Sequence, residues 1–504
     1  MNEQIETKSI LKVIGISSLG TLIEWYDFYI FGSLAVVLST KFFPLENPTA
    51  AFLSTLATFG AGFVVRPFGA LFFGSMGDLI GRKFTFIMTL TLMGGSTFLI
   101  GCIPSYAQWG YAAPALVLLL RLLQGLALGG QYGGAATYVA EHAPEGKRGY
   151  WTSWIQTTAT LGLFVSLMVI FSVKNILTEA DFDAWGWRIP FLLSIFLVFI
   201  SFWIKRYMDE SPVFQKAKKE GKTSKSPIRD SFGNKYNLKY ILLALFGAVL
   251  GQGVIWYTGQ FYAMTYMKKV MEVQTDQVDL LLGIALLIAT PFFVFFGWLS
   301  DKVGRKWIML LGMALAVITY RPIYEQMYQT TNTDNKTEMV NQTKVSSQKL
   351  SRSYGEEHQQ ITTKKYTDGT VYRLVQTTQV KPDKTEVTYH SNTKTITPKD
   401  RNMLCFYTFL QVLYITMVYG PIAAFLVDLF PAKLRYTSMS FPYHIGNGVF
   451  GGLLPAVSTY LVSNAQINND PQFYLAGLWY PIAISGVCFI IGAIYIDKSF
   501  IKHK

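Results

Sequence analysis

The sequence predicts an all-α membrane protein whose twelve transmembrane helices form two pseudo-symmetric six-helix halves. Three observations lead to this fold class. Hydrophobic residues make up 51% of the 504 residues and charged residues only 15%, whereas about 25% charged residues is usual in soluble proteins. Apolar runs long enough to cross a hydrocarbon core recur along the chain. Two motifs of the first half also recur in the second half with the same internal spacing.

Each apolar run of about 20 residues is long enough to cross about 30 Å as a helix. The twelve expected helices lie near residues 12–38, 50–76, 84–103, 111–141, 150–174, 188–207, 238–262, 277–299, 307–324, 402–427, 437–463 and 474–496. The ninth is short because Arg321 and Pro322 interrupt it. The first apolar run is too long for a cleaved signal peptide and no cleavage site follows it, so we expect a membrane helix there.

Lysine and arginine set the expected orientation, because cytoplasmic loops carry an excess of both. The connections after even-numbered helices hold pairs such as Arg82 and Lys83, whereas residues 103–111 and 464–473 hold neither residue type. Both termini are therefore expected in the cytoplasm, in a multi-pass protein of the plasma (bacterial inner) membrane. The net charge of +13 is spread over these loops, so we expect no nucleic-acid partner.

Two internal repeats define the halves. The stretch from Gly74 to Lys83 recurs from Gly297 to Lys306, 223 residues later, as Gly-x-x-x-Asp-x-x-Gly-Arg-Lys. A second pair is offset by 287 residues and consists of Glu141-x-x-Pro144-x-x-x-Arg148 and Asp428-x-x-Pro431-x-x-x-Arg435. We therefore expect an amino-terminal bundle (1–207), a cytoplasmic linker (208–237) and a carboxyl-terminal bundle (238–504), a repeat organisation typical of transporters.

The difference between the two offsets requires an insertion of about 64 residues in the second half, and residues 325–400 supply it. The helix count places this polar insertion on the periplasmic side, between helices nine and ten. Residues 385–396 alternate like a strand, and residues 365–372 contain an Asp-Gly pair typical of a hairpin turn. Composition supports a small β-rich subdomain and a disordered loop equally.

These motifs resemble a known family. The repeated Gly-x-x-x-Asp-x-x-Gly-Arg-Lys motif is similar to the signature of the major facilitator superfamily. Within it, residues 24–28 (Glu-Trp-Tyr-Asp-Phe), 66–69 (Arg-Pro-Phe-Gly), 121–125 and 129–134 resemble the metabolite:proton symporter family. The resemblance implies the major facilitator fold, with two six-helix bundles around a central cavity. Family members commonly carry a Glu where this chain has Gln131, so we expect no proton-linked role at that position.

Buried charges in the first half are candidates for function, because a charge inside a bilayer is costly. Glu24 and Asp27 share one helix face, and Arg66 and Arg121 are expected at similar depth. We expect Asp27, with Glu24 as its rival, to bind the coupling proton under the influence of Arg121. Arg66 is expected to bind substrate and favours an anion. The alternative is a set of static ion pairs that holds the helices together.

The second half offers uncharged polar groups in helices seven, ten and eleven. These side chains can hydrogen-bond a polar solute and stack on it, although helix packing explains any single one of them equally well. The candidate substrate-binding residues are Gln252, Trp256, Tyr257, Gln260, Gln411, Tyr414, Tyr443, His444 and Asn447.

The repeated motifs predict a gate at the cytoplasmic face. A carboxylate at a helix end can cap the amino terminus of an opposing helix and pair with a nearby Arg. The resemblance implies this role for Asp78, Arg82 and their counterparts Asp301 and Arg305, and simple topogenic charge is the alternative. The full set of gating candidates is Gly74, Asp78, Arg82, Glu141, Arg148, Asp301, Arg305, Asp428 and Arg435.

The expected function is secondary active transport. The resemblance implies proton-coupled symport, by alternating access, of a small polar metabolite such as an organic acid, a dicarboxylate or a zwitterionic osmolyte. A uniporter or exchanger on the same fold, or a transporter-like sensor that uses the insertion, is the alternative. The sequence has no metal-binding cluster, nucleophile elbow or phosphate-binding loop, so we expect no enzyme, metal or cofactor. The expected partners are the metabolite, protons and the lipid bilayer, and we expect a monomer.

Overall fold

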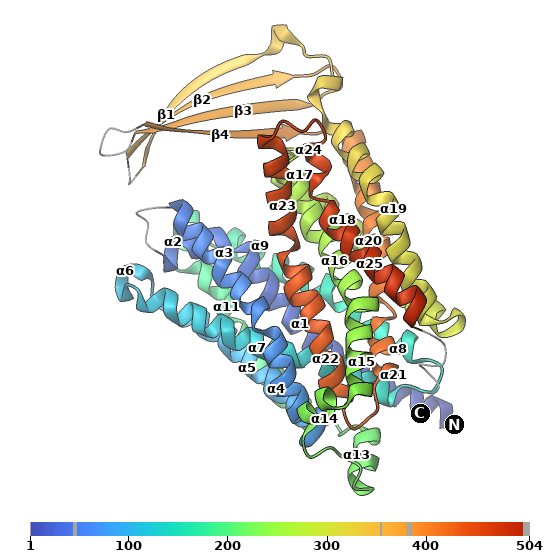
Figure 1. Cartoon of the computed structure of the whole chain (residues 1–504). Coiled ribbons are helices and arrows are strands. Elements are labelled where there is room, and N and C mark those ends of the chain that lie inside the picture. The colour runs from blue at the N-terminus through green and yellow to red at the C-terminus, as the bar shows by residue number, and fades with distance from the viewer. Residues whose placement is uncertain (1, 44–47, 353–354, 381–385, 497–504) are drawn as a thin grey trace.

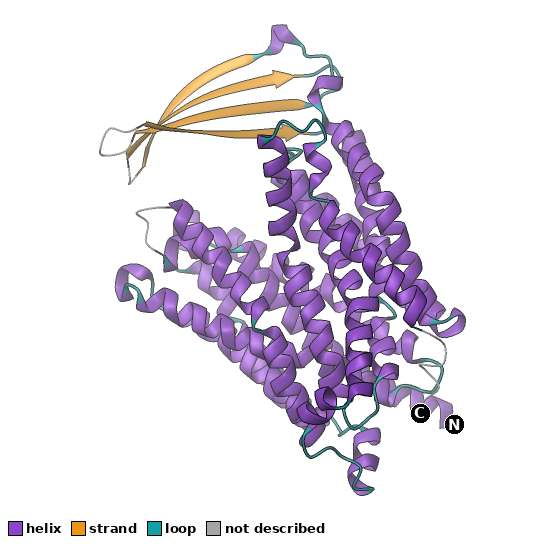
Figure 2. Cartoon of the chain, viewed as in Figure 1, coloured by secondary structure: helices purple, strands orange, loops and turns teal. Residues whose placement is uncertain are grey.

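The computed structural model describes residues 2–43, 48–352, 355–380 and 386–496. A long helical body carries a β-sheet at one end (Figures 1 and 2). The helices of the amino-terminal half are α1 (Asn2–Ser33), α2 (Ala35–Phe42), α3 (Pro48–Val64), α4 (Arg66–Leu79), α5 (Arg82–Cys102), α6 (Tyr106–Trp109), α7 (Ala112–His142), α8 (Arg148–Gln156), α9 (Thr158–Ile176), α10 (Glu179–Ala184), η1 (Gly186–Arg188), α11 (Ile189–Leu192) and α12 (Ser194–Tyr207).

Two short helices, α13 (Pro212–Lys219) and α14 (Pro227–Gly233), connect the halves. The carboxyl-terminal half contains three π-helical segments, η2 (Leu245–Val249), η3 (Thr258–Tyr262) and η6 (Ile445–Gly451). Its other helices are α15 (Lys235–Ala244), α16 (Leu250–Tyr257), α17 (Ala263–Lys269), α18 (Thr275–Val303), α19 (Arg305–Thr331), η4 (Thr333–Asn335), η5 (Val340–Gln342), α20 (Pro398–Tyr419), α21 (Ile422–Leu429), α22 (Arg435–His444), α23 (Gly452–Ile467), α24 (Phe473–Ala476) and α25 (Trp479–Tyr495).

The predicted spans agree with the structure, with two differences in shape. Within the described residues, ten helices are long and apolar enough to cross a membrane. The first predicted span is a pair, α1 and α2, bent by 66° just after Gly32 and Ser33, a residue pair at which helices commonly kink. The sixth is a shorter apolar helix over Gly186–Ile200. Together these account for the twelve predicted spans.

The ninth span is longer than predicted. Helix α19 runs through Pro322 to Thr331, because neighbouring helices can satisfy the backbone groups that a proline frees in a membrane helix. The Arg321 side chain leaves the apolar region by bonding to Gln472 Oε1 at 3.0 Å and lying over the Trp479 ring. The insertion therefore begins after Thr331, not at residue 325 as predicted.

The insertion is a β-rich subdomain, as one of the two alternatives predicted. Four antiparallel strands follow one another in order: β1 (Lys344–Arg352), β2 (Gly355–Lys365), β3 (Val371–Val380) and β4 (Glu386–Thr395). The predicted hairpin turn joins β2 to β3, where Gly369 has φ +95°, a conformation that glycine adopts without strain. The sheet rests on the second half, since Tyr372 and Asn392 both donate hydrogen bonds to the Glu272 carboxylate.

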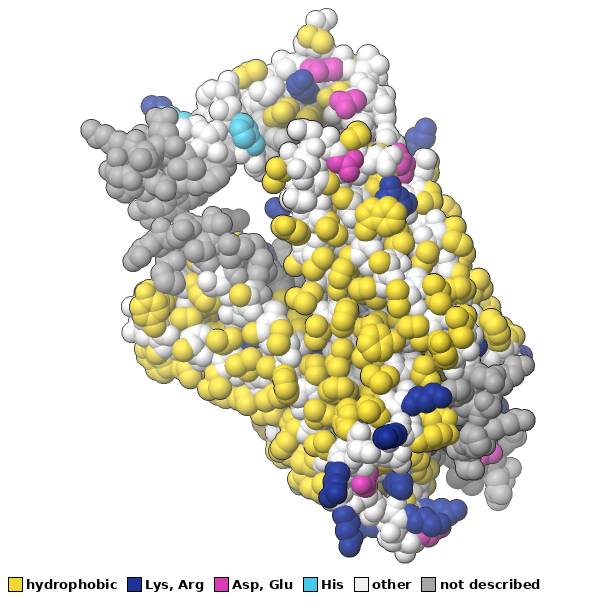
Figure 3. Space-filling view, viewed as in Figure 1, with side chains coloured by type: hydrophobic (Ala, Val, Ile, Leu, Met, Phe, Trp, Pro, Cys, Tyr) yellow, Lys and Arg dark blue, Asp and Glu magenta, His cyan; other side chains and the backbone are white. Residues whose placement is uncertain are grey.

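The two halves meet along several helices. α4 packs against α22, and α8 packs against α18. One hydrophobic core fills the second half and extends across the interface to Phe28, Tyr29, Phe63 and Tyr132 of the first half. The outer surface is largely hydrophobic along the middle of the molecule, with a group of Lys and Arg side chains at the end opposite the sheet (Figure 3). That distribution is the one a membrane-spanning protein needs.

Candidate functional site

Asp27 lies at the centre of a buried polar network in the first half. Its carboxylate pairs with Arg121 at 3.2 Å and accepts hydrogen bonds from Thr97 Oγ1 at 2.6 Å and Gln124 Nε2 at 2.8 Å. The Arg121 guanidinium also lies 4.3 Å from the centre of the Phe31 ring, a cation–π contact. Asp27 and Arg121 are thus brought together as the sequence predicted. The hydrogen-bonding partners belong to α1, α5 and α7, and Arg121 also lies 5.1 Å from the centre of the Phe59 ring of α3.

Glu24 and Arg66 are less constrained. Both are buried, yet they form no ion pair within the described residues, and Glu24 Oε2 and Arg66 Nε have no hydrogen-bond partner. Arg66 lies over the Phe63 ring at 4.3 Å and beside Gly448 of η6, where an added Cβ would contact its side chain at 3.8 Å. Arg66 therefore sits at the interface between the halves.

Aromatic rings from both halves surround this point. Trp25 of α1 lies 5.0 Å from Trp256 of α16, centroid to centroid, and Phe28 lies 5.4 Å from Phe261. Phe63 approaches Tyr257 at 6.3 Å. We call these six residues the aromatic cluster. Trp256 is 2% exposed, and its indole N–H has no partner within the described residues.

The polar candidates of the second half fall into two groups. Gln252 and Asn447 bond to each other through both amides, at 2.9 and 3.1 Å, near the aromatic cluster. His444 is buried, and neither ring nitrogen has a partner within the described residues. Tyr443 stacks on Tyr132 of the first half with ring centroids 3.8 Å apart. The four candidates of this first group lie on α16, α22 or η6, next to the interface.

The second group lies elsewhere. The Gln411 amide approaches Met327 of α19, and Tyr414 accepts a hydrogen bond from Thr319 of the same helix. Both side chains therefore face α19 rather than the interface between the halves, as expected for helix packing. Gln260 belongs to neither group. It is buried in η3, and along the chain it lies between Tyr257 and Phe261 of the aromatic cluster.

The gating candidates form two clusters. In the first, Asp78 accepts hydrogen bonds from the backbone N–H groups of Tyr436 and Thr437, at the amino terminus of α22, and pairs with Arg82 at 3.1 Å. Glu141 completes the cluster by pairing with Arg435 at 2.7 Å. Asp78 thus caps a helix of the other half, and Arg435 reaches back across the interface.

The second cluster repeats the first with the halves exchanged. Asp301 accepts hydrogen bonds of 2.8 Å from the N–H groups of Gly149 and Tyr150, at the amino terminus of α8, and pairs with Arg305. Asp428 pairs with Arg305 and, at 2.7 Å, with Arg148. In this structure the two clusters join the halves at the end opposite the sheet.

Glycine permits these helices to approach. A Cβ added to Gly149 would lie 2.5 Å from the Gly297 carbonyl oxygen, and one added to Gly74 would lie 2.9 Å from the Thr437 Cα. Any larger side chain would push the halves apart at these points. Gly74 was predicted to belong to the gate, whereas Gly149 was not.

Several residues of the site were not predicted from the sequence. Thr97 and Gln124 bond to Asp27. The signal for Thr97 was a polar side chain within an apolar run, whereas Gln124 also lies in the family-like stretch 121–125. Glu210, in the linker, accepts from the Arg82 and Lys83 backbone N–H groups at the start of α5. No group of three or more His, Cys, Asp or Glu residues in the described part of the chain could hold a metal ion.

Known proteins resemble this chain in sequence. The family described as "Sugar (and other) transporter" matches residues 13–341. The proline/betaine transporter of Escherichia coli is 35% identical over 329 residues, which are 64% of this chain and 65% of that protein. The inner membrane metabolite transport protein YhjE of Escherichia coli is 37% identical over 61% of this chain and 70% of that protein. The chain matches about 65% of the length of its proline/betaine relatives.

Among solved structures, the MFS (major facilitator superfamily) proton:xylose symporter XylE superposes with a TM-score of 0.65 over 98% of this chain and 97% of that chain. The sequence identity is 16%, so this likeness shows the fold. The predicted fold is therefore confirmed.

Proposed function

The chain belongs to the sugar (and other) transporter family of membrane transporters, and from this premise we propose that it carries a small zwitterionic metabolite together with protons by alternating access. It would do so in the bacterial inner membrane, with both termini in the cytoplasm. Figure 3 supports that orientation, because Lys and Arg gather at the end opposite the sheet.

The main observation in favour of a zwitterionic substrate is the position of Arg66 beside the aromatic cluster. A guanidinium with a free N–H matches a carboxylate. Aromatic faces attract an ammonium or quaternary ammonium group, most strongly when water is excluded. A zwitterion presents both groups, and the nearby Glu24 carboxylate adds a second attraction for the cationic end. The names of two proline/betaine relatives support the same class.

Proton coupling is proposed for the Asp27–Arg121 pair. Protonation of Asp27 would neutralise one member of a buried ion pair and leave Arg121 free to change its contacts. A proton that binds the two conformations with different affinity would favour one of them. Glu24 is the rival site, because it is buried, unpaired and close to the proposed substrate.

Alternating access is proposed to use the two clusters as an inner gate. All their contacts between the halves would break when the cytoplasmic side opens, and the contacts would form again when it closes. The glycine contacts described above allow the halves to return to the same close packing.

Uptake into proteoliposomes tests the proposal. We expect radiolabelled proline or glycine betaine to accumulate with an inward proton gradient and to equilibrate without accumulation when a protonophore is added. Arg66→Gln should remove uptake, whereas Arg321→Gln should retain it, because the hydrogen bond of Arg321 to Gln472 is exposed. Asp27→Asn should leave exchange but remove proton-driven accumulation. Accumulation by Asp27→Asn and not by Glu24→Gln would move the coupling site to Glu24.

The same assay separates the other candidate functions. Accumulation that ignores the protonophore would point to an exchanger or a uniporter. Preference for a dicarboxylate over both zwitterions would contradict the proposed substrate class while leaving proton coupling intact.

A further inference from the structure

A pocket of about 860 Å³ lies at the end of the molecule opposite the sheet. Its lining comes from the linker helices α13 and α14, from α15, and from the loop between α21 and α22, while Arg148 at the start of α8 adds a residue of the first half. Figure 1 shows α13 and α14 at this end, which the proposed orientation places in the cytoplasm. The volume is within the range of about 300–1,000 Å³ that is usual for small-molecule sites.

The lining of this pocket is basic. Four cationic side chains face two carboxylates: the cations are Arg148, Arg229, Lys433 and Arg435, and the acids are Asp230 and Asp428. Asp428 is already paired with two arginines. Arg229 and Lys433 are exposed, and among the described residues neither has an ion-pair partner. The pocket therefore carries positive charge that the protein itself leaves uncompensated.

The two arginines of the wall keep donors for a further acceptor. Arg148 and Arg435 each use Nε for a backbone carbonyl and Nη1 for a carboxylate. The Nη2 group of each donates to no described residue, and neither group belongs to the fully buried atoms without a partner. A guanidinium has five N–H donors. The two guanidiniums are also close enough to repel each other, and an anion that contacts both would offset this repulsion.

The rest of the lining suits an organic group attached to the anion. Tyr236 is 56% exposed, its ring centre lies 4.7 Å from that of Tyr240 one turn along α15, and the two hydroxyls bond at 2.6 Å. Apolar side chains complete the wall, namely Val213, Leu429, Phe430, Pro431 and Leu434. An exposed aromatic ring is a surface on which a nucleobase stacks.

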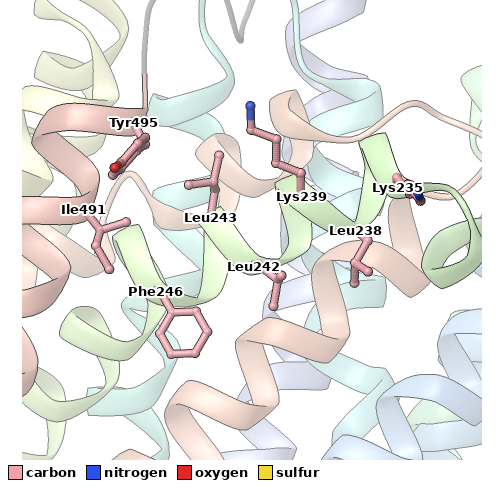
Figure 4. Close-up of a pocket in the computed structure, with 8 residues that line it drawn as sticks. All are labelled: Lys235, Leu238, Lys239, Leu242, Leu243, Phe246, Ile491 and Tyr495. Carbon is pink, nitrogen blue, oxygen red and sulfur yellow. The ribbon is translucent and has the colours of Figure 1, made fainter.

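Another face of α15 differs from this pocket. Figure 4 shows the groove between α15 and α25, where Leu242 and Phe246 belong to an apolar wall and Lys235 and Lys239 point apart. Those two lysines are not arranged to hold one anion between them. The aromatic residues of α15 and the four cations are instead gathered on the side that faces the linker.

From this arrangement we propose that the pocket binds a nucleoside phosphate of the cytoplasm, with the phosphates at Arg148 and Arg435 and the base against Tyr236. Guanidinium groups match phosphate oxygens in charge and in the spacing of their donors. Arg229 and Lys433 add attraction for the negative charge from the exposed part of the pocket.

Such a ligand would hold the proposed inner gate closed. Arg148 belongs to the first half and Arg435 to the second, and each is paired with a carboxylate of the other half. Separation of the halves would move the two guanidiniums apart, so a ligand that contacts both binds the closed state more tightly and favours it. This regulatory effect rests on the proposed transport mechanism, whereas binding at the pocket does not.

Isothermal titration calorimetry of the purified full-length protein with ATP tests the site without any transport measurement. We expect ATP to bind about tenfold more tightly than pyrophosphate, which lacks the base, and adenosine not to bind measurably. The variant R229Q/K433Q should lose about tenfold in affinity for ATP. K218Q/K219Q is the matched control, because it removes two cations from exposed positions on α13 outside the pocket.

Three further measurements sharpen the test. R229K/K433R should retain the affinity for ATP, and R229Q/K433Q should melt at the same temperature as the unchanged protein, which excludes misfolding. ATP affinity should be equal in nanodiscs of phosphatidylglycerol and of phosphatidylcholine, because a lipid headgroup is not the expected ligand. Asp301→Asn, which weakens the closed state, should lower the affinity for ATP.

Four results would overturn the proposed site. They are the absence of ATP binding, an equal loss of affinity in K218Q/K219Q, binding of pyrophosphate or adenosine as tight as that of ATP, and loss of ATP binding in phosphatidylglycerol nanodiscs, which would assign the pocket to a lipid headgroup. Equal affinities for ATP in Asp301→Asn and in the unchanged protein would refute the effect on the gate.

Discussion

Replacing Asp301 with Asn tests the gate most directly. The Asp301 carboxylate accepts two backbone hydrogen bonds of 2.8 Å from α8 and also pairs with Arg305. The bonds to Gly149 and Tyr150 cross between the halves, and in the proposed mechanism they break when this end opens. The substitution should therefore favour the state in which the cytoplasmic end is open.

The size of the effect follows from these bonds. Hydrogen bonds to a charged acceptor contribute about 1.5–3 kcal/mol each, against about 1 kcal/mol for neutral partners. An Asn has one acceptor oxygen and no charge. With the lower of these values it loses one bond of about 1.5 kcal/mol and weakens the other by about 0.5 kcal/mol, a change of about 2 kcal/mol. Because about 1.4 kcal/mol corresponds to a factor of ten, the population of the open state should rise about thirtyfold.

A buried reporter makes this shift measurable. Ser153 lies on α8, is fully buried, and faces Gly297 of α18 across the interface. In a background without Cys102, Cys405 and Cys488, a cysteine placed there by Ser153→Cys should react slowly with a maleimide. Asp301→Asn should raise that reaction rate about thirtyfold, provided that opening limits the reaction.

The control uses the other end of the same helix. Asp276→Asn removes the same charge from an exposed position in the first turn of α18 and should leave the rate unchanged. If Asp301→Asn labels no faster than Asp276→Asn, the capping contact does not hold the halves together, and the gate assignment for this cluster is wrong.

Three other predictions follow from the structure. Arg121→Gln should lower the free energy of unfolding by about 3–5 kcal/mol, because it leaves the buried Asp27 carboxylate unpaired, and adding Asp27→Asn should restore most of the loss in a thermal melt. Glu272→Ala removes the acceptor for two sheet side chains and should speed hydrogen exchange in β3 and β4 while uptake is retained. The third prediction concerns pH and the hydrogen-bonded pair Lys336 and Asp368 at the base of the sheet. Desolvation lowers the pKa of Lys336 and raises that of Asp368, but the hydrogen bond between them outweighs it, so the pKa of Lys336 is raised and that of Asp368 is lowered. The contribution of this pair to the stability of the sheet should therefore be complete between about pH 4 and pH 10 and should decrease on either side. Hydrogen exchange at the β2–β3 turn measures this change.

The repeats were enough to predict which residues form the charged clusters at the end opposite the sheet; that these clusters act as a gate stays a prediction. The spacing within each motif is a property of one helix end and the loop beyond it, so Asp78 and Asp301 could be assigned from the order of residues along the chain. The contacts that each cluster makes with the other half were not predictable. Arg435 pairs with Glu141 across the interface, and the two residues are 294 positions apart, too far for any local signal of that contact.

For the substrate-binding candidates, too, the sequence indicated the residues but not their contacts. Residue type and depth selected Gln411 as readily as Asn447, but a one-dimensional pattern does not tell which face of a helix meets which neighbour. Gln411 faces α19, whereas Asn447 bonds to Gln252 beside the aromatic cluster. The bend at Gly32 and the continuation of α19 past Pro322 depended likewise on packing.

The amino-acid sequence by itself determined the membrane class, the number of spans, the internal repeats and the residues of the two charged clusters, because hydropathy, charge and repeat spacing act along the chain. Tertiary structure alone decided that Asp27 is paired while Glu24 forms no ion pair among the described residues, and that Arg435 reaches across the interface. Those outcomes depend on distances between segments far apart in the chain, where the energy of a contact is set by the partner that packing supplies.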